Sequence, residues 1–349
     1  MRKFSIVFMA ILFAVSMAWG ATSNPEARKW FEKAHAAEQS KDFRAAAAYY
    51  SKAISLDPSF WEAYYNRGNA YRILGQFHKA LKDFSEAISL NPDCVQAYNN
   101  RGYVFEQLGQ YQSALKDFAE AIKRAPENAD IFLNRGSVYE KTGQGRSAFE
   151  DYTRAIALDP ENPKFYFARG RIEAKIGRVR KAIEDYTEAI GLDPEYTDAY
   201  YNRGTLYART GQLEKALSDY TKAMELDPEK EEAHFNVGVI LGKLGRYEEA
   251  VEAFTRAVEL DAEDEKAYMG RGYCLAMMGK HRDAIKDYTK AIALDPTDAD
   301  AYLNRGISYR KIGNKRAFVA DYRKAASLGS KQARAYLRSE GIGWGGASE

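Results

Sequence analysis

The sequence predicts an all-α protein built from nine consecutive copies of one helix–turn–helix unit, and three observations support this prediction. Arg-Gly recurs at intervals of 34 residues or multiples of 34, at 67–68, 101–102, 135–136, 169–170, 203–204, 271–272 and 305–306. An aromatic residue follows each of these glycines by 16 positions, and an alanine follows that aromatic by three. Apolar residues between these landmarks recur with helical spacing. A fixed period of this length is typical of stacked repeats.

Extending the register gives nine units, which we call repeats one to nine: 27–60, 61–94, 95–128, 129–162, 163–196, 197–230, 231–264, 265–298 and 299–332. The first half of each unit places positions 3, 4, 7, 10, 11 and 14 on one face of a helix, helix A. The second half forms helix B, with Ala at position 20 in eight repeats and at position 27 in all nine. One such pair cannot bury its own apolar face, so its stability must come from stacking on its neighbours.

Position 8 of helix A is Gly in eight repeats. Glycine inside a helix is less favourable than alanine by about 1 kcal/mol, so its recurrence needs a structural reason. We expect helix B to approach closely here through its small alanines at positions 20 and 27.

Position 7 is Arg and position 23 is Asp in the same seven repeats: 67/83, 101/117, 135/151, 169/185, 203/219, 271/287 and 305/321. Repeat seven lacks both residues and has Val237 and Ala253 instead. Because the two are lost together within one unit, we predict a partly buried ion pair that joins helix A to helix B of the same repeat. Loss of one partner from a fully buried pair would destabilise the fold by about 3–5 kcal/mol.

Both ends of the array carry distinct segments. Asn24-Pro25 suits the start of the first helix. After repeat nine, we predict a capping helix at 333–340 with Ala335 and Tyr336 at positions 3 and 4 of the register, followed by a flexible tail at 341–349.

The first twenty residues have the composition of a secretory signal. Arg2 and Lys3 precede an apolar run from Phe4 to Trp19, and small residues follow. We expect cleavage after Gly20 and an exported protein, periplasmic in a bacterium or secreted, that contacts a membrane only through this segment before cleavage. The alternative is an uncleaved anchor, although the run is shorter than the roughly 20 residues that a spanning helix needs.

The repeated residues resemble the tetratricopeptide repeat family, whose pattern has an aromatic at 4, Gly at 8, Tyr at 11, Ala at 20, an aromatic at 24, Ala at 27 and Pro at 32. The resemblance covers nearly the whole chain after the signal. It implies a right-handed superhelix, an α-solenoid of nine helix pairs with a concave groove. The resemblance indicates a scaffold for protein binding and leaves the ligand open.

The groove-facing positions of helix A provide the candidate site. Position 6 is Asn in six repeats: Asn66, Asn100, Asn134, Asn202, Asn236 and Asn304. An amide both donates and accepts hydrogen bonds, so it can pair with the backbone of an extended peptide. The alternative is that these amides bond locally within the scaffold.

Aromatic and basic residues share this face. Positions 5 and 9 carry Tyr65, Tyr103, Phe167, Tyr201, Phe235 and Tyr273. Position 13 is basic in four successive repeats, and repeat five adds a further arginine: Lys141, Lys175, Arg209, Lys243 and Arg171. The aromatics favour peptide binding, and the cations favour an acidic partner. The alternatives are that the aromatics pack between repeats and that the cations complement the helix dipole.

Several function classes are disfavoured by the sequence. The repeats leave no room for a catalytic domain, the four histidines are scattered without metal-ligand spacing, and no phosphate loop or nucleophile elbow occurs. We therefore expect no enzyme activity, no cofactor and no metal. The formal charge of +2 falls to 0 without Arg2 and Lys3, so we expect no nucleic-acid partner.

The leading hypothesis is an exported scaffold that binds an extended peptide or partner protein, in a cell-envelope assembly or secretion complex. Two alternatives remain open, a chaperone-like holdase for unfolded clients and a glycan-handling scaffold of a polysaccharide export system. The sequence leaves the oligomeric state open.

Overall fold

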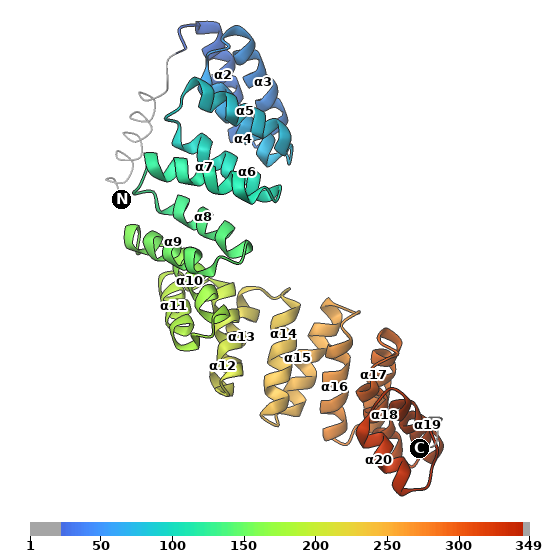
Figure 1. Ribbon diagram of the computed structural model, residues 1–349. Helices are drawn as coiled ribbons and strands as arrows, with labels where there is room; N and C mark the ends of the chain where they lie inside the picture. The colour runs from blue at the N-terminus through green and yellow to red at the C-terminus, as the bar shows by residue number, and fades with distance from the viewer. Residues whose placement is uncertain (1–21, 345–349) are drawn as a thin grey trace, which may run out of the picture. The chain divides into compact units, whose positions relative to one another are not determined.

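The computed structural model describes residues 22–344, which contain helices and turns and no strand (Figure 1). The predicted signal at 1–20 lies outside the described residues. The chain divides into two compact units, Met1–Ile172 and Glu173–Glu349, and the boundary falls inside one helix. No helix in the described range has both the length and the apolar character needed to cross a bilayer.

The helices of the first unit pack as successive pairs (Figure 1). They are α2 (Pro25–Gln39), α3 (Phe43–Leu56), α4 (Trp61–Ile73), α5 (Phe77–Leu90), α6 (Val95–Gln107), α7 (Tyr111–Arg124), α8 (Ala129–Lys141), α9 (Gly145–Leu158) and the first part of α10 (Pro163–Lys175). The second helix of one pair also packs against the first helix of the next, as with α5 and α6. The predicted fold of stacked helix pairs is confirmed in this unit.

The second unit repeats the same pairing (Figure 1). Its helices after α10 are α11 (Val179–Leu192), α12 (Thr197–Arg209), α13 (Leu213–Leu226), α14 (Glu231–Lys243), α15 (Tyr247–Leu260), α16 (Glu265–Met277), α17 (His281–Leu294), α18 (Ala299–Lys311), α19 (Lys315–Ser327) and α20 (Lys331–Ser339). From α12 to α19, each even-numbered helix is an A helix and packs against the B helix that follows it.

The turn between the A and B helices requires an unusual backbone conformation. At position 15, repeats two to nine have a glycine with φ between 70° and 82°. Glycine adopts this left-handed region without the steric penalty of a Cβ atom. Repeat one has Lys41 at the same place with φ 60°.

The glycine at position 8 is explained by the aromatic ring at position 24. A Cβ atom on Gly68 would lie 2.8 Å from Cε1 of Phe84, and one on Gly136 would lie 2.5 Å from Cε1 of Tyr152. Such distances are too short for van der Waals contact, so an alanine at either of these two positions would clash with the ring. Helix B thus approaches closely at this glycine, as we expected, but its nearest group is the aromatic ring and not the alanines at positions 20 and 27.

The predicted Arg–Asp pair is confirmed in six repeats, always within one unit of the register. The Arg Nε and Nη2 atoms donate to the two carboxylate oxygens over 2.7–2.8 Å. The six pairs are 67/83, 101/117, 135/151, 203/219, 271/287 and 305/321. The two residues of the seventh pair, Arg169 and Asp185, belong to different units.

Five of these six arginines also reach back to the preceding repeat, which the sequence did not lead us to expect. The Nη1 atom of Arg203 donates to the Thr187 hydroxyl over 3.0 Å. A Ser or Thr at position 25 receives the equivalent bond from Arg67, Arg101, Arg271 and Arg305. Each of these arginines therefore links three helices.

The C-terminal helix departs from the predicted register. Helix α20 begins at Lys331, two residues before the predicted start, because α19 has 13 residues where other B helices have 14 and because the turn after it is shorter. Ala333 and Leu337 are buried, whereas Ala335, which we placed at a buried position, is exposed.

The segment after α20 is partly packed. Ile342 and Trp344 contact the apolar cluster of α18, α19 and α20. The Nε atom of Arg323 donates to the carbonyl oxygen of Gly343 over 2.8 Å. Residues 341–344 thus make packing contacts, and the flexibility predicted for 341–349 stays a prediction; residues 345–349 lie outside the described range.

Candidate binding surface

We use the term A-helix face, in each unit by itself, for the side chains at positions 5, 6, 9, 12 and 13 of the A helices from α4 to α18. In the first unit, Asn100 Nδ2 donates to Asn69 Oδ1 over 2.8 Å and to the Tyr65 hydroxyl over 3.2 Å. Asn134 Nδ2 donates to Asn99 Oδ1 over 3.0 Å. The amides thus bridge neighbouring A helices, which is the local role that we held as the alternative.

The second unit repeats this bridge once, where Asn236 Nδ2 donates to the Tyr201 hydroxyl over 2.9 Å. Asn202 and Asn304 are half-buried, while Asn66 in the first unit is buried. The series lacks asparagine at Gly270, because a Cβ atom there would lie 2.5 Å from Cζ of Phe254.

The aromatic residues of the A-helix face differ in exposure. The rings of Tyr65 and Tyr201 pack against Phe84 and Tyr220, and burial raises the pKa of both phenols. The five half-buried aromatics are Tyr65, Tyr103, Phe167, Tyr201 and Phe235. Tyr273 stands apart because it is 48% exposed.

Two of the five predicted basic residues are paired within the protein, and both lie in the first unit. Lys141 Nζ is 3.0 Å from Glu106 Oε1, and Arg171 Nη2 is 2.6 Å from Glu140 Oε2. The remaining three, Lys175, Arg209 and Lys243, lie in the second unit and are exposed. No ion pair to them is described within residues 22–344.

Glu173, at a position usually held by Tyr, is also paired. Its carboxylate is buried and lies 3.5 Å from Nη1 of Arg178. The buried acid therefore has a cationic partner in the turn that follows its helix.

The A-helix face is hollowed between α16, α17 and α18. This hollow has a volume of about 450 Å³, and Tyr273, Met277, Asn304, Ile307, Ser308 and Lys311 contribute to its lining. Met277 is 51% exposed, so it and Tyr273 present apolar surface to solvent. We call this feature the α16–α18 hollow.

Ser308 adds an unusual polar group to this hollow. It is only 1% exposed, and its hydroxyl has no hydrogen-bond partner among the described residues. The same position is apolar in preceding repeats, as at Val138 and Ile240. A buried hydroxyl without a partner is unfavourable, so a ligand group that bonds to it would gain stability. The break in an apolar column was the sequence signal that could have identified Ser308.

Family profiles match most of the chain. Profiles of the tetratricopeptide repeat match residues 61–94, 95–128, 129–162, 195–263, 265–298 and 287–317. A profile described as TPR repeat matches 39–72 and 170–211. The search of curated proteins found no match.

Solved structures of repeat proteins resemble this chain. YrrB, described as a TPR protein with an unusual peptide-binding site, is 25% identical, aligns with 54% of this chain and 97% of its own, and has a TM-score of 0.51. The C-terminal part of a TPR repeat-containing protein from Cytophaga hutchinsonii is 19% identical over 69% of this chain and 98% of its own, with a TM-score of 0.58. PilF of Pseudomonas aeruginosa is 17% identical over 60% and 97%, with a TM-score of 0.51. The last two show likeness of fold alone.

Proposed function

Because the chain belongs to the tetratricopeptide repeat family, we propose that it is a non-enzymatic scaffold that binds an extended segment of a partner protein on its A-helix face. The peptide-binding site named for YrrB supports this class of ligand. Our proposal includes no catalytic step and no cofactor.

The α16–α18 hollow carries the proposal. Tyr273 and Met277 offer exposed apolar surface, which favours contact with an apolar side chain of the partner. Asn304 and Ser308 line the same hollow, and the Asn304 amide can bond to a peptide backbone. The exposed cations of the second unit, such as Arg209 and Lys243, would favour acidic residues elsewhere in the segment.

The cellular setting of the proposal rests on the sequence of residues 1–20. A cleaved signal would place the scaffold outside the cytoplasm, in a bacterial periplasm or in the secreted fraction. An envelope assembly or secretion complex would then supply its partner.

The test is to select binders from a random dodecapeptide library and to measure their dissociation constants by isothermal titration calorimetry. We expect selected peptides to share an apolar residue, and Tyr273→Ala combined with Met277→Ala to weaken their binding at least tenfold, since buried aromatic anchors dominate such interfaces.

The control is Leu192→Ala, which removes an exposed apolar side chain from the end of B helix α11. It should leave the dissociation constants unchanged. Equal binding by the double variant would refute the proposed site, and micromolar binding of unrelated unfolded peptides would favour the holdase.

A further inference from the structure

Repeat seven differs from repeat six at four positions whose residues line one hollow in the fold. In the six repeats whose Arg–Asp pair is described, position 4 is aromatic, position 7 is Arg, position 11 is aromatic or leucine, and position 23 is Asp. Repeat seven has His234, Val237, Leu241 and Ala253 at these places. None of these four residues can form the ion pair, and together they leave more space than the residues of repeat six.

Repeat six shows what normally fills this space. The guanidinium group of Arg203 lies 5.7 Å from the ring of Tyr200 and 5.9 Å from the ring of Tyr207, so the two rings flank it. The group bonds to both carboxylate oxygens of Asp219 and to the hydroxyl of Thr187 in the preceding repeat. The arginine stem and head thus occupy the groove between two successive B helices.

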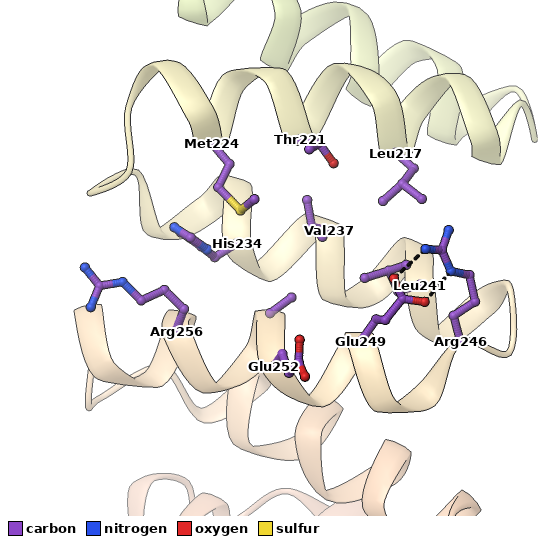
Figure 2. Close-up of a pocket in the computed structure, with 11 residues that line it drawn as sticks. Leu217, Thr221, Met224, His234, Val237, Leu241, Arg246, Glu249, Glu252 and Arg256 are labelled. Carbon is purple, nitrogen blue, oxygen red and sulfur yellow. Dashed lines mark hydrogen bonds and ion pairs between the residues drawn. The ribbon is translucent and has the colours of Figure 1, made fainter.

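At repeat seven, the groove is an open hollow of about 440 Å³ between α13, α14 and α15, which we call the α13–α15 hollow. Figure 2 shows Leu217 and Met224 of α13 facing Val237 and Leu241 of α14 across it. These apolar side chains suit the methylene stem of a long side chain.

Polar groups for a cationic head remain in place. Thr221 is the equivalent of Thr187, one period later, and Figure 2 shows its hydroxyl directed into the hollow. Glu252 lines the hollow from α15, beside the Ala253 that replaces the usual aspartate. Within residues 22–344, no ion pair to Glu252 is described. Two arginines also line the hollow, and each already has a carboxylate partner: Arg246 bonds to Glu249 over 2.7 Å, and Arg256 lies 2.9 Å from Glu229.

We propose that the α13–α15 hollow accepts an arginine side chain of a partner protein. The stem of this arginine packs on Val237 and Leu241, and its guanidinium group donates to the Thr221 hydroxyl and the Glu252 carboxylate. The protein itself places an arginine in the equivalent groove of six other repeats, which shows that this fold accommodates the group. The hollow is separate from the α16–α18 hollow, so this inference does not depend on the proposed function.

The experiment uses the full chain labelled with carbon-13 at its methionine methyl groups. Met224 lines the α13–α15 hollow and Met277 lines the α16–α18 hollow, so one NMR spectrum reports on both. The probe is the acetylated, amidated tripeptide Gly-Arg-Gly, compared with versions that carry citrulline or norleucine in place of arginine. We expect the arginine peptide to shift the Met224 resonance saturably and to leave Met277 unchanged.

Two variants test the assignment. The double variant Val237→Arg/Ala253→Asp recreates the pair of repeat six and should abolish the Met224 shift while retaining the helical circular dichroism spectrum. Glu252→Gln should weaken binding about three- to fivefold, as expected for a partly exposed charge pair.

Three outcomes would overturn the proposal: no saturable shift of Met224, an equal shift with the citrulline peptide, or unchanged binding by the folded double variant. Stronger binding of the norleucine peptide would assign the hollow to an apolar side chain instead.

Discussion

Repeats six and seven are adjacent, and each consists of an A helix packed on a B helix. Different interactions join the two helices in the two repeats. Repeat six joins α12 to α13 through the bidentate pair of Arg203 and Asp219. Repeat seven lacks this pair, and α14 packs on α15 in a large apolar cluster that includes Val237, Leu241 and Phe254. The comparison teaches that the ion pair is compatible with the fold without being required by it, and that its loss opens a hollow.

The largest effect should come from breaking the pair of repeat six. Asp219→Ala leaves Arg203, whose side chain is only 15% exposed, without its carboxylate partner. We expect a loss of about 3 kcal/mol, the lower part of the range for buried pairs because some solvent reaches the arginine. Urea unfolding followed by circular dichroism measures this loss.

The matched control is Asp198→Ala, which removes an exposed carboxylate 3.0 Å from Lys230. Such surface pairs contribute at most about 1 kcal/mol. Equal losses in the two variants would show that the pair of repeat six contributes no more than a surface contact, and the contrast with repeat seven would disappear.

A smaller difference in stability should separate alanine variants of the position-8 glycines of repeats six and seven, Gly204 and Gly238. A Cβ atom on Gly238 would lie 2.9 Å from three ring atoms of Phe254, whereas one on Gly204 would lie no closer than 3.2 Å to Asp219 or Tyr220. Gly238→Ala should therefore destabilise the protein by about 2 kcal/mol through overpacking. Gly204→Ala should be nearly neutral, because the gain of about 1 kcal/mol in helix propensity offsets its milder crowding. Thermal unfolding of both variants tests this order, and the reverse order would contradict it.

The smallest effect concerns pH at the start of repeat seven. Burial, and next the negative charge of Asp264, raise the pKa of Glu231 to about 7. The folded protein therefore holds a proton that the unfolded chain releases near pH 4.5, so stability falls as pH rises from about 4.5 to 7 and the loss is complete above pH 7. After allowance for solvent screening, we expect roughly 1 kcal/mol.

Glu231→Gln should abolish this part of the pH dependence and stabilise the protein at pH 8 relative to the parent. Repeat six begins with Thr197, which does not titrate, so Thr197→Val serves as the control and should leave the pH profile unchanged. A profile unchanged by Glu231→Gln would contradict the raised pKa.

The sequence was sufficient for the features that depend on backbone periodicity. The 34-residue period predicted the helix pairs, and the joint loss of Arg and Asp at Val237 and Ala253 predicted pairing within a repeat. The start of helix α20 was predicted two residues too late, because a shorter helix and a shorter turn precede it. A fixed period cannot represent a change in loop length.

The candidate site was less predictable because it depends on side-chain conformation across repeats. Asn100 and Asn236 sit at the predicted position, yet their amides bond to neighbouring A helices, and a helical wheel of one repeat cannot show this. Lys141 is likewise neutralised by Glu106 of the preceding repeat. The α13–α15 hollow arises from four smaller side chains acting together, which only their packing reveals.

The position-7 arginine that links three helices affects how a chain of this kind can gain or lose a whole repeat. Its carboxylate partner belongs to its own repeat, so a duplicated or deleted repeat carries the whole ion pair with it. Only the hydroxyl bond depends on the neighbour, and Arg135, which follows a repeat with Ala119 at position 25, keeps its bonds to Asp151. Gain or loss of a whole repeat therefore risks, for this arginine, one hydroxyl contact at the new junction and leaves its charge compensated by its own aspartate.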